Sequence, residues 1–200
     1  MKRYEVEGLE LDVYMHDCVY EPSDDSMLGV RLLINLARRG FRFERIVDVG
    51  TGSGILALAA AKLFNPVNLV AIDVNPYAVA TANMTLRGLG LVVRCDSVSC
   101  IKPGALWDLV VINPPYLPVD EASPGECWGF YEAAWSGKYS LGRLCSEAAS
   151  IARGMVVVYS SLSPIDVAGL LEGLGFRIKY SVKQGFFMEE LRAVYVVRDW

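Results

Sequence analysis

Residues 45–54 read Arg-Ile-Val-Asp-Val-Gly-Thr-Gly-Ser-Gly, and this stretch decides the fold of the chain. Its first half, Arg45–Val49, is a short apolar run typical of a buried strand, and the helix-period segment Ile55–Phe64 follows its last glycine. Glycine allows the backbone to turn sharply and allows a ligand to reach the N-terminus of a helix without meeting a Cβ atom. The stretch therefore predicts a strand–turn–helix unit with a ligand-binding site at its turn.

Strands and helices alternate on both sides of this unit. We expect strands at 67–72, 91–95, 106–112, 155–160, 176–182 and 191–197, and helices at 26–39, 76–87, 140–153 and 164–174. Asp24 or Asp25 is placed to cap the first of these helices. Repeated strand–helix units predict an α/β fold in which a parallel sheet carries helices on both faces.

The length and composition predict one folded domain. The chain has 200 residues, of which 53% are hydrophobic, and this composition excludes a disordered or collagen-like chain. Within a single domain spanning 1–200, residues 1–40 form an N-terminal extension that ends in the first helix. Residues 117–137 are irregular and rich in proline and glycine, and we interpret them as a lid over the substrate.

Charge and cysteine content narrow the class of protein. Nineteen Lys and Arg residues against 23 Asp and Glu give a net charge of -4, which argues against a protein held on nucleic acid by phosphate contacts. The cysteines (Cys18, Cys95, Cys100, Cys127 and Cys145) are widely spaced, and His16 is the single histidine. We therefore expect no zinc site and no disulfide framework. Because the charged N-terminus does not resemble a signal peptide, we expect a cytoplasmic, reduced protein.

Acidic residues follow successive predicted strands. Asp48 precedes the glycine turn, and Asp73 ends the next strand, where a carboxylate is placed to accept hydrogen bonds from both ribose hydroxyls. Asp96 and Ser97 follow the third strand, where Asp96 could accept from an adenine amine. Ile55 occupies a position that the dinucleotide fingerprint reserves for Gly or Ala, which argues against a nicotinamide dehydrogenase. The pattern predicts a nucleoside ligand without a pyrophosphate.

Asn113-Pro114-Pro115-Tyr116 follows the apolar strand 106–112. Asn113 supplies a side-chain acceptor, and the prolines have no N–H, so the backbone presents carbonyl oxygens alone. Two neighbouring acceptors complement the two hydrogens of an NH2 group, and Tyr116 adds a flat face for a planar amide or base. At the carboxyl edge of a parallel sheet, this motif predicts a site for an amino-group substrate.

These residues together resemble the class I S-adenosylmethionine-dependent methyltransferases, in particular the HemK-type branch that methylates the side-chain amide of glutamine. Val19-Tyr20-Glu21-Pro22 followed by Asp25-Ser26 is similar to a stretch of the short archaeal and eukaryotic members, whose substrate is the Gly-Gly-Gln loop of the class 1 translation release factor. Glu132–Gly137 followed by Gly142-Arg143 is similar to a second stretch, although one extra residue and Lys138 depart from the pattern there.

The resemblance implies a fold and a site. The fold would be a doubly wound, Rossmann-like methyltransferase domain with a mostly parallel seven-stranded sheet and a C-terminal antiparallel strand. S-adenosylmethionine, without a metal, would contact Tyr20, Ser26, Asp48, Gly50, Gly52, Gly54, Asp73, Asp96, Ser97 and Asn113. The glutamine would contact Asn113, Pro114, Pro115, Tyr116 and Trp135, and catalysis would rest on Asn113, Pro114 and Tyr116.

Partners follow from the same resemblance. In the usual strand order of this fold, 91–95 is an unpaired apolar edge strand, which is an aggregation hazard unless something covers it. The short family members pair such a strand with a small zinc-containing activator protein, so we expect a heterodimer. The alternative is that self-association masks the surface.

Two other functions remain open from the sequence. The Asn-Pro-Pro-Tyr motif also serves enzymes that methylate an exocyclic base amine of DNA or RNA, although the chain has neither a basic run nor spare length for holding a strand. A catalytically silent scaffold that retains the fold is the second alternative.

Overall fold

A computed structural model describes residues 1–102, 104–114 and 141–198. The expected lid at 117–137 lies outside these residues, as do Pro115, Tyr116 and Trp135. Within the described residues, no helix is long and apolar enough to cross a membrane.

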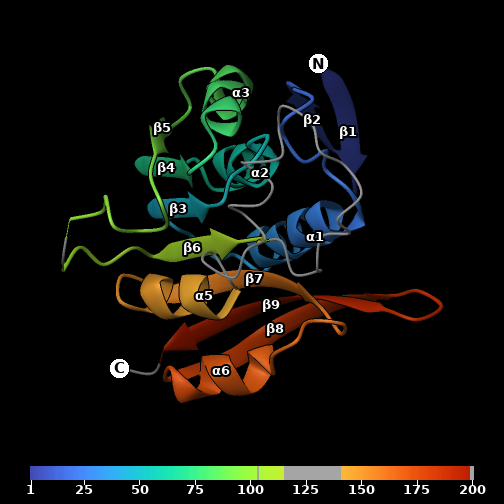
Figure 1. Ribbon diagram of the computed structural model, residues 1–200, viewed down its shortest axis with the longest axis vertical. Helices are drawn as coiled ribbons and strands as arrows, with labels where there is room; N and C mark the ends of the chain where they lie inside the picture. The colour runs from blue at the N-terminus through green and yellow to red at the C-terminus, as the bar shows by residue number, and fades with distance from the viewer. Residues whose placement is uncertain (103, 115–140, 199–200) are drawn as a thin grey trace.

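A seven-stranded sheet forms the centre of the molecule (Figure 1). Its strands are β3 (Arg45–Val49), β4 (Asn68–Asp73), β5 (Leu91–Arg94), β6 (Leu109–Ile112), β7 (Gly154–Ser160), β8 (Phe176–Gly185) and β9 (Glu190–Arg198). They are ordered β5-β4-β3-β6-β7-β9-β8, and β9 runs antiparallel to both of its neighbours. The expected mostly parallel sheet with a C-terminal antiparallel strand is therefore confirmed.

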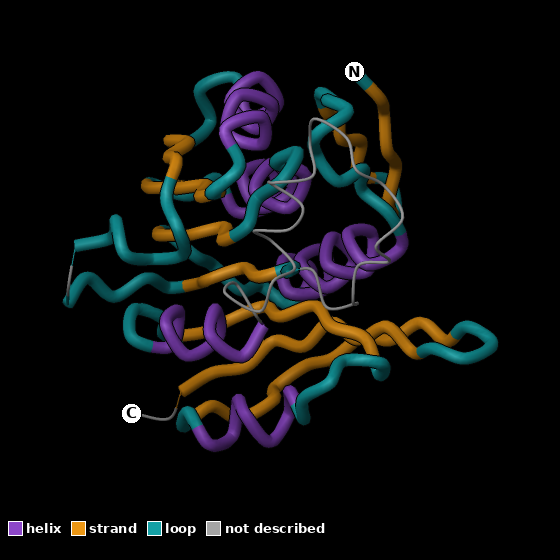
Figure 2. Tube along the Cα trace, viewed as in Figure 1, coloured by secondary structure: helices purple, strands orange, loops and turns teal. Residues whose placement is uncertain are grey.

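Helices cover both faces of this sheet (Figure 2). They are α1 (Asp24–Arg38), α2 (Ile55–Phe64), α3 (Pro76–Leu86), α5 (Leu141–Ala149) and α6 (Val167–Gly173). Successive strand residues point to opposite faces, so Ile46 packs in the core under α1 and α2, while Val47 packs in the core under α5 and α6. Burial on both faces explains why the central strands read as continuous apolar runs.

The N-terminal extension contains a hairpin that the sequence analysis missed. Strands β1 (Lys2–Val6) and β2 (Leu9–Val13) pair antiparallel around Glu7 and Gly8, which both have positive φ, at 49° and 87°. A Glu-Gly pair between two short alternating runs was the available signal for this turn. Leu11 and Val13 are fully buried and belong to the same core as α1 and α2.

Several expected boundaries are corrected. Ser23 is the N-cap of α1, so Asp24 and Asp25 lie in its first turn rather than capping it. The α5 helix ends at Ala149, four residues before the expected end, and α6 begins only after Asp166, whose carboxylate accepts from Gly169 N–H. Because Asp166 is the N-cap, the helix begins at Val167 and not at residue 164, where the apolar periodicity predicts its start.

The prediction of a reduced chain without a disulfide framework is wrong at Cys95 and Cys100. Cys95 and Cys100, five residues apart, form a disulfide, with their Cα atoms separated by 6.2 Å. The turn after β5 folds back and brings the two sulfurs together, which a search for Cys-x-x-Cys spacing could not detect. Cys145 is a buried free thiol.

Candidate active site

The carboxyl ends of the parallel strands β3, β4, β5, β6 and β7 meet at one edge of the sheet (Figure 1). Val49 at the end of β3 is in register with Ile72 of β4 on one side and with Ile112 of β6 on the other. After β3 the chain adds β4 and β5 on one side and then crosses to place β6 on the opposite side. Open α/β sheets bind their ligands at such a switch point, so the glycine turn lies where a ligand is expected.

The glycine turn is hydrogen-bonded to the end of β4, and its first two glycines have space beside their backbone among the described residues. Gly50 N–H and Thr51 N–H donate to the carbonyl oxygen of Ile72, at 2.9 and 3.0 Å. Gly50 and Gly52 have φ values of 72° and 55°, a left-handed conformation that favours glycine. Apart from the adjacent residues, no atom of the described chain lies within 4 Å of where their Cβ atoms would stand. The turn therefore leaves room beside its backbone.

Asp48 lies beneath this turn and is 1% exposed. Its Oδ2 accepts from Thr51 Oγ1 at 2.6 Å and from Ala57 N–H at 3.1 Å. Burial raises the pKa of Asp48 to about 7, although these hydrogen bonds act in the opposite direction. In the structure, this carboxylate joins β3, the turn and the first turn of α2.

Asp73 ends β4 beside the turn. Its Oδ2 accepts from Gly52 N–H and its Oδ1 accepts from Asn75 N–H, both at 2.9 Å. Burial raises the pKa of this carboxyl, and the backbone donors partly counter that effect. Asn75, rather than Asp73, is the N-cap of α3 and accepts from Tyr77 N–H.

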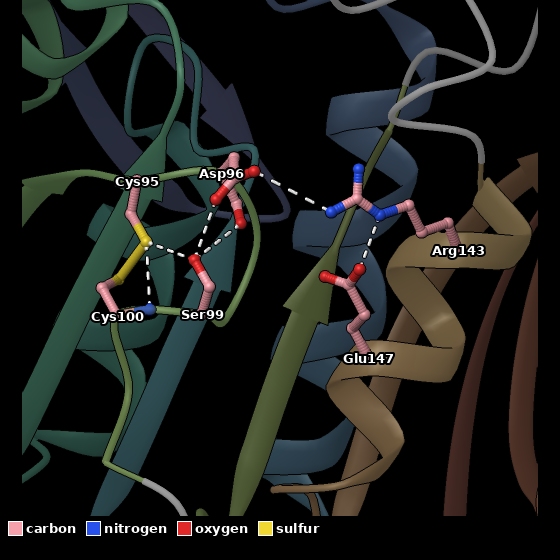
Figure 3. Close-up of polar contacts among 6 residues, drawn as sticks. All are labelled: Cys95, Asp96, Ser99, Cys100, Arg143 and Glu147. Atoms are coloured by element: carbon pink, nitrogen blue, oxygen red, sulfur yellow. Dashed lines mark hydrogen bonds and ion pairs between the residues drawn. A yellow bond between two sulfur atoms is a disulfide. The ribbon is translucent and has the colours of Figure 1, made fainter.

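Asp96 and Ser97 follow β5. Figure 3 shows that Asp96 has polar contacts both within its own loop and with α5. Asp96 Oδ1 accepts from Ser99 Oγ at 2.8 Å, and Asp96 Oδ2 lies 3.8 Å from Arg143 on α5. Ser97 has a φ of 66°, and its buried Oγ has no hydrogen-bond partner within the described part of the chain. Arg143 therefore links this loop to the other side of the site, a role that only its place in the fold reveals.

Asn113 follows β6 and turns its amide nitrogen toward α1. Its Nδ2 lies 3.1 Å from Asp25 Oδ2 and 3.4 Å from Ser26 Oγ. Its Oδ1 is buried and has no hydrogen-bond partner among the residues that the structure describes. Pro114, which follows it, is buried. A buried acceptor without a donor is costly in an apolar setting and is typical of a site that binds a ligand donor.

The N-terminal segment reaches the same edge. Ser26 lies against Asn113, whereas Tyr20, just before α1, is 52% exposed. Partial burial and the nearby Asp25 carboxylate raise the pKa of the Tyr20 hydroxyl. His16 Nδ1 accepts from Cys18 N–H, and its ring stacks on Tyr77 at 4.6 Å, so His16 has structural partners here.

The structure thus brings most of the sequence-predicted site residues to one sheet edge. It gathers the glycines, Asp73, Asp96, Ser97, Asn113, Pro114 and Ser26 there, with Asp48 underneath. In residues 1–102, 104–114 and 141–198, no group of three His, Cys, Asp or Glu side chains could hold a metal ion. Asp25 was missed as a site residue, because its position at the start of a helix suggested a capping role.

Comparison with known proteins gives several relatives. Over 198 residues, covering 95% of this chain and 96% of the relative, the chain is 29% identical to a Methanocaldococcus jannaschii protein named as a protein N5-glutamine methyltransferase. It is 34% identical over 119 residues to the release factor glutamine methyltransferase of Koribacter versatilis, of which it spans 40%. It is 33% identical over 128 residues to human methyltransferase HEMK2, with 60% of this chain and 58% of that protein covered.

The fold is shared with solved methyltransferases. The 16S rRNA N2 G1207 methyltransferase of Thermus thermophilus, solved with AdoMet and guanosine, superposes with a TM-score of 0.68 at 17% identity. The superposition covers 99% of this chain and 50% of that one. A sequence model described as the methyltransferase small domain matches residues 12–144, which is more than half of the chain. The chain belongs to the methyltransferase small domain family.

Proposed function

We propose that this chain methylates the side-chain amide nitrogen of glutamine, with S-adenosylmethionine as the methyl donor. The observation that carries the proposal is the buried Oδ1 of Asn113, an acceptor at the carboxyl edge of the sheet that has no donor among the described residues. The archaeal and bacterial relatives are named as glutamine methyltransferases, which favours an amide over a base amine. The net charge of -4 also offers little to hold a nucleic acid strand.

The residues at the sheet edge fit S-adenosylmethionine. Among the described residues, Gly50 and Gly52 have open space beside their backbone, and the buried Ser97 Oγ lacks a hydrogen-bond partner. Asp73 would hold the ribose hydroxyls, while Asp96 and Ser97 would bind the adenine. A sulfonium supplies an already activated methyl group, so the protein has to position its acceptor rather than activate the donor.

The amide would be held by two oxygens. Asn113 Oδ1 and the Pro114 carbonyl would each accept one hydrogen of the NH2 group, which directs the nitrogen lone pair out of the amide plane. An amide nitrogen is a poor nucleophile because its lone pair is delocalised, and these acceptors stabilise the positive charge that develops on nitrogen during attack. The proton can leave afterwards, so the arrangement needs no strong base.

For the substrate, we propose the Gly-Gly-Gln loop of a class 1 release factor. A glutamine preceded by two glycines can reach a recessed acceptor, because its neighbours carry no side chains that would block the approach. The Koribacter relative is named as an enzyme of this type, and the Tyr20–Ser26 segment resembles the release-factor branch.

Mass spectrometry of a matching release factor tests the proposal. The factor is incubated with the chain and isotope-labelled S-adenosylmethionine, and the matched control carries asparagine in place of the loop glutamine. We expect one labelled methyl group on the glutamine and none on the control. Labelling that persists in the control, or labelling of RNA instead, would contradict the proposal.

We also propose a partner on β5. The structure places β5 at the edge of the sheet, with Leu91 62% exposed and Leu89 53% exposed beside it. An activator protein containing zinc would add a strand to this edge and cover both leucines. Sedimentation and activity measurements on the isolated chain test this proposal. A monomeric, soluble and fully active chain would refute it, and a homodimer that disappears in Leu91→Lys would indicate self-association instead.

A further inference from the structure

The amide of Asn113 has a defined orientation. Its Nδ2 carries two hydrogens and faces two acceptors on α1, Asp25 Oδ2 at 3.1 Å and Ser26 Oγ at 3.4 Å. Its Oδ1, on the opposite side of the same planar group, is buried without a partner among the described residues. The nitrogen is therefore committed to the protein, and the oxygen remains available.

Asp25 is fixed before it meets Asn113. The residue is 6% exposed in the first turn of α1, where the helix dipole favours a carboxylate. Its Oδ1 accepts from Ser26 N–H at 2.7 Å and faces Ser26 Oγ at 3.3 Å. Both carboxylate oxygens thus face donors, with Oδ1 turned to Ser26 and Oδ2 turned to Asn113.

An ionised carboxylate accepts hydrogen bonds and cannot donate them. A rotation of the Asn113 amide by 180° about χ2 would place its oxygen against Asp25 Oδ2, leaving two buried acceptors face to face. It would also turn Nδ2 toward the site, where a substrate NH2 group brings further hydrogens. Leaving buried polar groups unpaired in this way is costly, so Asp25 selects one orientation.

We propose that Asp25 is a positioning residue that fixes the amide of Asn113 with Oδ1 toward the substrate nitrogen. The identity of the substrate rests on the proposed function, but the orientation itself does not. Asp25 acts through Asn113 and does not touch the reacting atoms.

Exchanging the polarity of the two side chains tests the proposal. In Asp25→Asn, the backbone N–H of Ser26 retains the remaining oxygen, so the new NH2 group faces Asn113 and the Asn113 amide turns over. We expect kcat to fall about 100-fold, which is the size of loss seen when one preorganised hydrogen-bonding group is removed from an active site. The Kd for S-adenosylmethionine should change little. Asp24→Asn, on the exposed neighbour in the same helical turn, removes the same charge and should retain kcat.

The reciprocal variant provides a rescue. Asn113→Asp alone places two carboxylates against each other and should be as inactive as Asp25→Asn. In the double variant Asp25→Asn/Asn113→Asp, the amide donates to the carboxylate, whose second oxygen again faces the site as an acceptor. We expect kcat within about tenfold of the unchanged chain. A double variant no more active than either single variant, or Asp25→Asn with unchanged kcat, would overturn the proposal.

A measurement without substrate separates this proposal from the proposed function. The side-chain NH2 signals of Asn113, identified by their loss in Asn113→Asp, should be protected from solvent exchange in the unchanged chain and should lose that protection in Asp25→Asn. Fast exchange of these signals in the unchanged chain would overturn the positioning role. Protected signals in a chain that methylates no glutamine would refute the proposed function alone.

Discussion

The backbone N–H of Gly52 donates to Oδ2 of Asp73 over 2.9 Å, which ties the glycine turn after β3 to the end of β4. The contact makes one structural unit of two motifs that lie 21 residues apart in the chain. Asp73 thereby fixes the path of the backbone along which a nucleoside would lie. The carboxylate has spare lone pairs for a diol beside the turn.

Asp73→Ala should weaken the binding of S-adenosylmethionine before it affects the chemical step. The loss of two hydrogen bonds to a charged acceptor predicts a Kd about 100-fold higher, measured by calorimetry. Asp73→Asn retains one acceptor oxygen and should show a smaller loss. A kcat that collapses while the Kd is unchanged would mean that Asp73 acts in the chemistry instead.

Asn113→Ala should have the opposite effect. It removes the acceptor oxygen at the site and leaves the glycine turn and Asp73 intact, so we expect at least about 100-fold loss of kcat with cofactor affinity largely retained. Single-turnover transfer to a glutamine substrate and calorimetric titration measure the two quantities. An equal loss of both would show that Asn113 chiefly holds the cofactor.

Asp48 should make folding stability decrease as the pH rises. Its pKa lies at about 7 in the folded chain against an ordinary value of 3.8, so the folded state binds the proton more tightly than the unfolded state. The contribution of this group is therefore most favourable below about pH 4 and is lost progressively up to about pH 7. Urea unfolding between pH 4 and 8 should show a shallower decline in Asp48→Asn than in the unchanged chain. If stability declined equally with pH in both proteins, the pH dependence would come from groups other than Asp48.

Reduction of the Cys95–Cys100 disulfide should destabilise the chain modestly. A loop closed over five residues of separation predicts about 2 kcal/mol of stabilisation through the unfolded state. Thermal unfolding with and without a dithiol reductant measures the difference. The unfolding temperature of Cys100→Ser should not change with the reductant, because this variant lacks the bond.

Cys145 is buried and its pKa is raised to about 12, so it should remain unreactive toward thiol reagents in the folded chain.

The sequence alone determined the sheet, the glycine turn and the residues at the carboxyl ends of its strands. Apolar β-branched runs such as Leu109–Ile112 have few alternatives to a buried parallel strand, and a glycine-rich turn between a strand and a helix has a narrow range of conformations. These are local properties, because they depend on residues that are near one another in the chain. The N-terminal hairpin was also local, but its short polar strands gave a weak signal.

Only the tertiary structure decided which distant side chains meet. Asp25 contacts Asn113 across 88 positions of the chain, and Arg143 approaches Asp96 from another helix. Neither pairing has a sequence signature, because crossover connections set the spatial order of the elements and side-chain packing then selects the partners. The orientation of the Asn113 amide is also decided by the tertiary structure, because it depends on contact with the Asp25 carboxylate. The sequence alone placed that carboxylate only at the start of a helix.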